Sequence, residues 1–172
     1  MKRSFRLELY DEGKEAACYA VKFYEKEHSE PEQFENNIHQ NEPESFEDIN
    51  YRLENMLEEH LFLPPMLELE EGKRDDWVVA IKTKEPKQLR WYGLRYSPEI
   101  LILGNGGLKT TKTYQEDPHL HQCVQDLQYV FRCIQKRMKR NRIEFDTTTR
   151  RIKGNIEFPV KHFADIDYPE KD

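Results

Sequence analysis

Polar and apolar positions alternate at the start of the chain and predict a β-hairpin. Residues 5–10 read Phe-Arg-Leu-Glu-Leu-Tyr, which has the period of two that a half-buried strand requires. Residues 18–24 repeat this period with aromatic and β-branched side chains. The stretch between them, residues 11–14, is Asp-Glu-Gly-Lys and is typical of a turn. We therefore expect the two strands to pair.

Two helices are predicted after this hairpin. Ser29, followed by Pro31 near the first turn, starts a short helix that runs to about Gln40. Pro43 breaks that helix, and Ser45 is expected to be the N-cap of the next one. The second helix has one apolar stripe, formed by Phe46, Ile49, Leu53, Met56 and Leu57.

The middle of the chain reads as a series of strands. Residues 77–81, 89–96 and 100–103 are apolar or alternating, and a tight turn predicts that the last two pair as an antiparallel hairpin. The run Gly-Asn-Gly-Gly at 104–107 lacks the spacing of a phosphate-binding loop, and no helix starts after it. We interpret it as a bulge or bend, with strand character resuming over 108–113.

A long helix and a second hairpin complete the pattern. Asp117 is the expected N-cap, Pro118 the first helical residue, and 136–140 a basic last turn that suits the helix dipole. Residues 143–145 and 152–160 are expected to form an exposed hairpin. Runs of neighbouring strands, separated by helices, predict an α+β fold.

Length and composition indicate one intracellular domain. We assign residues 1–164 of the 172 to a single α+β domain and residues 165–172 to a flexible tail. The mean hydropathy is -0.96 and no apolar run is long enough for a membrane span. The N-terminus has no signal-peptide pattern. The three cysteines are odd in number and sparse, which favours a reducing, cytoplasmic location.

Charge divides the chain into an acidic and a basic part. Residues 1–72 contain 7 Lys and Arg against 19 Asp and Glu, a net charge of -12. Residues 73–164 have a net charge of +9, which is enough to neutralise several phosphates. The acidic part either shields this basic part or keeps the protein in solution.

Basic and aromatic residues are interleaved at 87–114. A period of two places Arg90 and Tyr92 on one face of a strand, with Lys109 and Lys112 on the neighbouring strand or at its end. Such a surface can bind phosphates and stack bases, and its cations and proton-transferring groups can cleave RNA. The alternative is a half-buried hairpin with solvated cations. The spacing of His and Cys predicts no metal site, and we expect no cofactor.

Three segments carry a resemblance to a known family. Residues 89–96, 100–103 and 109–113 resemble the core of RelE/HigB-type toxins, in which an Arg-bearing aromatic strand, an apolar strand and a Lys-Lys-Thr-x-Lys-Thr segment precede a helix. The resemblance covers about residues 77–140. It implies a curved antiparallel sheet flanked by helices, with a RelE/ParE-like core. It also implies a bacterial toxin–antitoxin system in which the toxin cleaves mRNA on the ribosome without a metal and is inhibited by an antitoxin.

The resemblance also suggests roles for individual residues. The expected catalytic residues are Arg95, Tyr96, Lys109 and Lys112. The expected nucleic-acid contacts are Arg90, Tyr92, Tyr114, Lys136, Arg137, Lys139 and Arg140. Two other functions remain open. One is RNA or ribosome binding without cleavage, and the other is a protein-interaction module whose partner surface is formed by the acidic helices.

Overall fold

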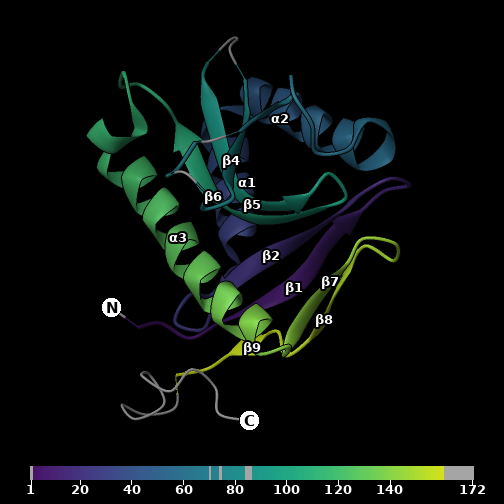
Figure 1. The fold of residues 1–172 in the computed structure, drawn as a ribbon. Coiled ribbons are helices and arrows are strands. Elements are labelled where there is room, and N and C mark those ends of the chain that lie inside the picture. The colour runs from purple at the N-terminus through teal and green to yellow at the C-terminus, as the bar shows by residue number, and fades with distance from the viewer. Residues whose placement is uncertain (1, 70, 74, 84–86, 161–172) are drawn as a thin grey trace.

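The strands form one large sheet and a separate hairpin. The computed structural model describes residues 2–69, 71–73, 75–83 and 87–160 of the chain. Its strands are β1 (Phe5–Glu12), β2 (Ala17–Phe23), β3 (Leu67–Glu68), β4 (Val78–Lys82), β5 (Leu89–Ser97), β6 (Ile100–Leu108), β7 (Ile143–Asp146), β8 (Arg151–Gly154) and β9 (Glu157–Phe158). The large sheet has the order β3-β4-β5-β6-β2-β1-β9, and β7 pairs with β8 (Figure 1).

The large sheet is mixed. Strands β2 and β6 run parallel, with residues 17–20 opposite residues 100–103, and all other neighbours are antiparallel. The expected antiparallel pairing is therefore found for every neighbouring pair but one, and the expectation needs correction at β2 and β6. After β2 the chain crosses to the far edge, and three antiparallel steps bring β6 back beside β2 in the same direction. The local patterns predicted the two hairpins, but no local pattern encodes this long-range pair.

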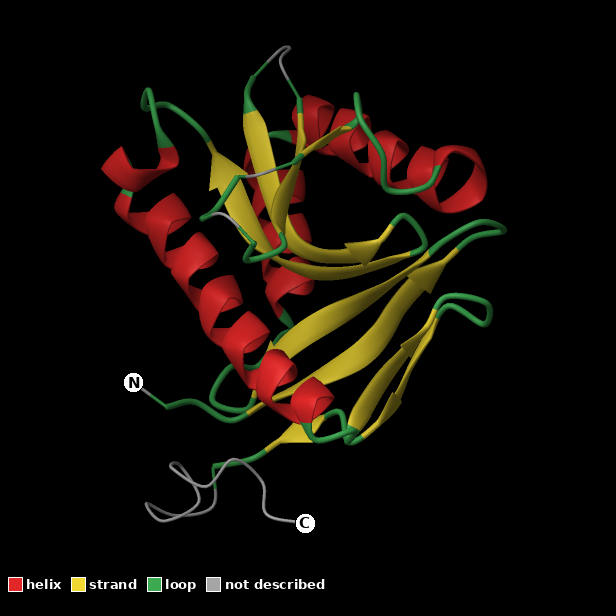
Figure 2. Ribbon diagram, in the orientation of Figure 1, coloured by secondary structure: helices red, strands yellow, loops and turns green. Residues whose placement is uncertain are grey.

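Helices cover both faces of the large sheet. They are α1 (Glu30–Asn41), α2 (Pro43–Asn55), α3 (Pro118–Lys139), a π-helical turn η1 (Met56–His60) and a 3-10 turn η2 (Tyr114–Glu116). Figure 2 shows α3 on one face and the two N-terminal helices on the other. The α+β class is thus confirmed. None of the helices in the described residues has the length and apolar character that crossing a membrane requires.

Two apolar cores separate these layers. On one face, Phe5, Val21, Tyr92 and Leu94 pack with the buried stripe of α3 and with the β7–β8 hairpin. On the other, the opposite side chains of the same strands pack against α1, α2 and η1. Strands whose side chains are apolar on both sides are buried on both sides, which explains the almost continuous apolar runs in β4 and β6.

Several predicted boundaries need correction. Ser45 is not an N-cap, because α2 already starts at Pro43, a position that tolerates proline since its missing N–H is not needed there. Strand β6 runs unbroken through the glycine run to Leu108, and residues 109–113 are not a strand. Residues 152–160 split into β8 and β9, and β9 joins the edge of the large sheet beside β1.

The first hairpin and the long helix agree with the sequence pattern. Strands β1 and β2 pair antiparallel, and α3 starts after Asp117, whose side chain accepts hydrogen bonds from the backbone of His119 and Leu120. The proposed tail, residues 165–172, lies outside the described residues.

Candidate functional site

The glycine run brings β5 and β6 unusually close. The pairing shifts between Trp91 and Gly93, which confirms the expected bulge. A Cβ atom on Gly106 would lie 1.9 Å from the carbonyl oxygen of Arg90, so only glycine fits there. Trp91 Nε1 donates a hydrogen bond of 3.0 Å to the carbonyl oxygen of Gly104. The bulge therefore fixes the backbone on both sides of Arg90.

Alternation along β5 then places Arg90 and Tyr92 on the α3 side of the sheet. Tyr92 packs in the core on that side, whereas Leu89 and Trp91 pack in the opposite core. The ring of Tyr114, in η2, meets the ring of Tyr92 edge-on at a centroid distance of 6.2 Å. Three of the predicted nucleic-acid contacts thus come together, because Arg90, Tyr92 and Tyr114 lie on one side of one end of the sheet.

A carboxylate that the sequence did not single out lies beside these residues. Glu71 Oε1 is 3.7 Å from Arg90 Nε, and both side chains are almost buried. Burial is the main cause that raises the pKa of Glu71, and Arg90, Lys109 and Lys82 oppose the rise. We call Glu71, Arg90, Tyr92, Lys109 and Tyr114 the Arg90 site.

Two polar atoms of the Arg90 site are buried without a hydrogen-bond partner among the described residues. They are Arg90 Nε and the hydroxyl of Tyr92. Burial, and then the charge of Glu71, raises the pKa of Tyr92. Burial also raises the pKa of Tyr114. Both tyrosines are therefore protonated at neutral pH and can donate a hydrogen bond.

The two predicted lysines lie in the segment that follows β6, and Lys109 is the one that acts on Glu71. The backbone N–H of Lys109 donates to the carbonyl oxygen of Gln88 at 2.8 Å, which holds Lys109 beside the start of β5. Lys112 is exposed in the connection between β6 and η2. The lysines can therefore be reached from solvent, whereas Arg90 is 8% exposed and Tyr92 is fully buried.

Arg95 and Tyr96, the other predicted catalytic residues, lie at the far end of β5. Five residues of extended chain separate Arg95 from Arg90, about 16 Å. Arg95 Nε donates a hydrogen bond of 2.8 Å to the carbonyl oxygen of Phe62. Tyr96 stacks on Phe145 with a centroid distance of 4.3 Å. The four predicted catalytic residues therefore do not share one site.

The basic end of α3 is also remote from the Arg90 site. Lys136 follows Pro118 by 18 residues, so about 27 Å of helix separates them. Arg137 is only 3% exposed, donates hydrogen bonds to the carbonyl oxygens of Asn155 and Glu157, and lies over the ring of Phe158. These contacts attach β9 to the helix, so the guanidinium of Arg137 is already engaged within the fold. Lys139 and Arg140 retain some exposure.

Sequence reasoning missed Glu71 because nothing in its neighbourhood marks it. It lies in a polar stretch that reads as a linker, and its backbone N–H donates to the carbonyl oxygen of Val78. That contact continues the β3–β4 pairing and turns the carboxylate toward β5. The two-residue strand β3, which precedes Glu71, has no pattern that would predict it.

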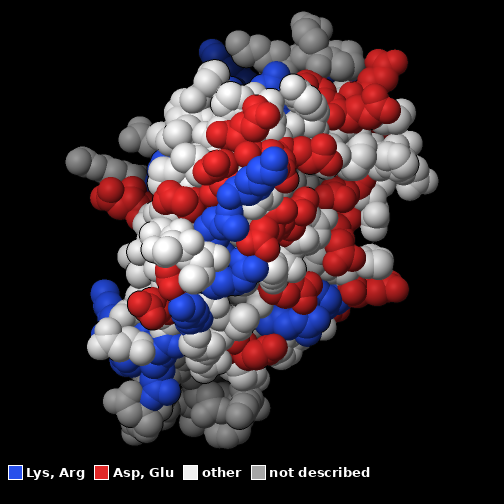
Figure 3. Space-filling view, turned by 90° about the vertical axis from the view of Figure 1, so that its right-hand side faces the viewer, with Lys and Arg blue, Asp and Glu red and all other residues white. Residues whose placement is uncertain are grey.

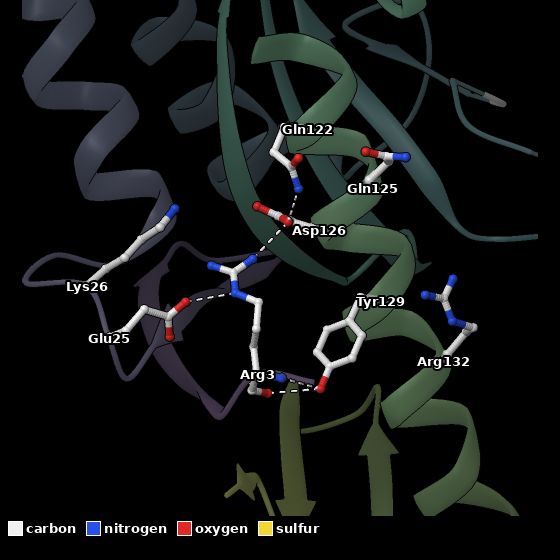
Figure 4. A pocket seen from close by; sticks show the side chains of 8 residues that line it. All are labelled: Arg3, Glu25, Lys26, Gln122, Gln125, Asp126, Tyr129 and Arg132. Carbon is white, nitrogen blue, oxygen red and sulfur yellow. Dashed lines mark hydrogen bonds and ion pairs between the residues drawn. The ribbon is translucent and has the colours of Figure 1, made fainter. Parts of the chain in front are cut away.

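Apart from the Arg90 site, a polar pocket lies between the N-terminal segment, the β2–α1 connection and α3 (Figure 4). Its volume is about 480 Å³, and it is lined by Arg3, Glu25, Lys26, Gln122, Gln125, Asp126, Tyr129 and Arg132. Arg3 pairs with Glu25 at 2.7 Å and with Asp126 at 2.8 Å. None of the residues predicted from the sequence lines this pocket.

Comparison of the chain with protein-family models, with curated proteins and with solved structures found no match.

Proposed function

We propose that this protein is a ribonuclease of the RelE/HigB toxin type and that the Arg90 site is where it binds and cleaves RNA. The observation that carries the proposal is the convergence of Arg90, Tyr92, Tyr114 and Lys109 around the largely buried carboxylate of Glu71. The resemblance assigned contact with RNA or its scissile phosphate to Arg90 and Lys109, and acid/base or stacking roles to Tyr92 and Tyr114. Glu71 supplies a proton acceptor with a raised pKa.

Substrate binding in this proposal starts at the two lysines and Tyr114. The ammonium groups of Lys109 and Lys112 attract the RNA backbone, and Tyr114 offers an aromatic face for one base. The lysines and Tyr114 then position the RNA strand, and Arg90 and Tyr92 bind one of its phosphates.

Cleavage needs a base, a cation and an acid. Glu71 takes the proton of the ribose 2′-hydroxyl, and the 2′-oxygen forms a bond to phosphorus. Arg90 stabilises the charge that develops on the phosphoryl oxygens. The bond from phosphorus to the 5′-oxygen breaks, and Tyr114 gives that oxygen its proton. The products are a 2′,3′-cyclic phosphate and a 5′-hydroxyl.

The test is induced expression in bacteria, with growth and bulk mRNA integrity followed together. We expect growth arrest and mRNA fragmentation from the wild-type chain and neither from Lys109→Ala/Lys112→Ala. The matched control is Lys136→Ala/Lys139→Ala, which removes the same charge from the exposed end of α3. Equal toxicity of all three chains would contradict the site. RNA binding without fragmentation would instead indicate a non-catalytic RNA-binding protein.

One observation favours protein interaction as a second candidate. Tyr51 of α2 is 61% exposed, and residues 42–60 around it have a net charge of -6. Figure 3 shows many Asp and Glu side chains on one face of the molecule, with a band of Lys and Arg side chains between them. The acidic segment around Tyr51 fits a partner with a basic surface. Loss of partner binding in Tyr51→Ala, with RNA fragmentation unchanged, would assign that role to α2 separately from the Arg90 site.

A further inference from the structure

Two buried donors of the Arg90 site have no acceptor among the described residues. Arg90 Nε–H and the Tyr92 hydroxyl both lie on the α3 side of β5, two residues apart. Leaving such groups unpaired lowers stability, so each one in a native protein calls for an explanation. One ligand that accepts a hydrogen bond from each of the two donors would explain both.

The ion pair with Glu71 does not satisfy Arg90. At 3.7 Å, Nε and Oε1 attract each other electrostatically but are too far apart for a hydrogen bond. Arg90 and Lys109 both act on the carboxylate, and Lys82, which also acts on it, is paired with Glu68 at 2.6 Å. Arg90 and Lys109 thus bring more positive charge than Glu71 alone neutralises.

We propose that Arg90 and Tyr92 form a pair of donors for one phosphate group and that Glu71 occupies Arg90 in competition with this phosphate when no phosphate is bound. This inference rests on the function proposed above and adds an internal competitor to it. A phosphate accepts from two donors at once and brings more negative charge than a carboxylate, so it displaces Glu71 from Arg90. The displaced carboxylate then lies beside the bound substrate.

Tyr92→Phe tests the donor role. The substitution removes only a hydroxyl that has no partner among the described residues, so the variant should unfold at the same or a higher temperature than the wild type. We expect its affinity for inorganic phosphate, measured by titration followed through the thermal unfolding midpoint, to fall about tenfold. A merely structural hydroxyl would give the opposite combination, lower stability and unchanged affinity.

Glu71→Gln tests the competitor role. We expect this variant to bind inorganic phosphate about tenfold more tightly than the wild type and, if Glu71 is the base, to lose RNA cleavage. The matched control is Glu68→Gln, three residues earlier, where a partly exposed carboxylate pairs with Lys82. It removes the same charge, and its effect should be less than about threefold.

The outcomes separate the inference from the proposed function. Unchanged phosphate affinity in Glu71→Gln, or an equal gain in Glu68→Gln, would overturn the competitor role and leave the two-donor phosphate site standing. Unchanged affinity in Tyr92→Phe and in Arg90→Gln would overturn the two-donor phosphate site and, with it, the site assigned to cleavage. If Glu71→Gln does not fold, Glu71→Asp replaces it, because the shorter carboxylate is expected to weaken competition.

Discussion

At the scale of single residues, the close approach of β5 and β6 depends on Gly106. Its missing side chain leaves room for the carbonyl oxygen of Arg90, which a Cβ would otherwise meet at 1.9 Å. We expect Gly106→Ala to lower the free energy of unfolding by more than about 3 kcal/mol, because backbone atoms have to move apart. Denaturant unfolding followed by circular dichroism measures this loss.

The neighbouring Gly107 provides the comparison for that experiment. A Cβ at Gly107 would meet side-chain atoms of His119 at 3.1 Å and of Leu120 at 3.3 Å, which can shift slightly. Gly107→Ala should therefore cost clearly less stability than Gly106→Ala. Equal losses would mean that the glycine run serves flexibility in general, and not this one backbone contact.

At the scale of elements, α3 depends on its N-terminal cap. The carboxylate of Asp117 accepts hydrogen bonds of 2.9 Å from the N–H of His119 and 3.1 Å from that of Leu120. Asp117→Ala should lower the free energy of unfolding by about 1 kcal/mol, because two helix N–H groups lose their acceptor. The exposed Gln115, substituted by alanine, is the control and should change stability little. A neutral Asp117→Ala would show that Pro118 alone is enough to start the helix.

The turn between β7 and β8 is predicted to respond to acid. A hydrogen bond from Lys153 is the main cause that lowers the pKa of Asp146 to about 2. The carboxylate also accepts from the backbone N–H of Thr148 and Thr149. The pKa of Asp146 in the folded protein lies below its ordinary value of 3.8. The ionised carboxylate therefore stabilises the fold fully above pH 3.8, and this stabilisation is lost as the pH falls toward 2.

Carboxyl chemical shifts followed by NMR during acid titration measure this effect. Asp146 should titrate near pH 2 in the wild type and move toward its ordinary value in Lys153→Ala. Lys139→Ala, which removes a lysine from α3, should leave the midpoint in place. If the titration midpoint of Asp146 stays near pH 2 in Lys153→Ala, the backbone N–H groups of Thr148 and Thr149 lower its pKa instead.

Individual elements could be predicted from the sequence where one local rule dominated. The period of two predicted β1, β2 and β5, and the N-cap at Asp117 predicted the start of α3. Local rules failed at Ser45 and in the glycine run, because two signals competed and tertiary contacts decided between them. The parallel pair of β2 and β6 had no local signal at all.

The candidate site was predictable to the extent that strand alternation determines it. Arg90 and Tyr92 face the same side because they are two residues apart, and the resemblance pointed to both. Arg95 was not separated from them, because the expected bulge or bend at residues 104–107 kept the hairpin register from being extended to Lys109. The place of Glu71 beside Arg90 could not be predicted from the sequence, because it depends on the two-residue strand β3, which no sequence pattern marks.

At the scale of the whole molecule, opposite charges are concentrated on different parts of the chain. The RNA binding proposed for the Arg90 site is therefore expected to depend on salt. Each phosphate neutralised on single-stranded RNA contributes about -0.7 to the slope of log affinity against log salt. Lys109→Ala/Lys112→Ala should make the slope shallower by about 1.4, as measured by fluorescence anisotropy with a short RNA. The slope of Lys136→Ala/Lys139→Ala should equal that of the wild type.

The parallel pair of β2 and β6 has a consequence for synthesis of the chain. Residue Ala17 lies opposite Ile100, so the inner edge of β2 has no partner until 83 more residues have been made. At 5–20 residues per second, this takes roughly 4–16 seconds. During that interval the N-terminal hairpin presents an open strand edge to other chains. Slow translation of the middle of the message should therefore favour aggregation of the nascent protein.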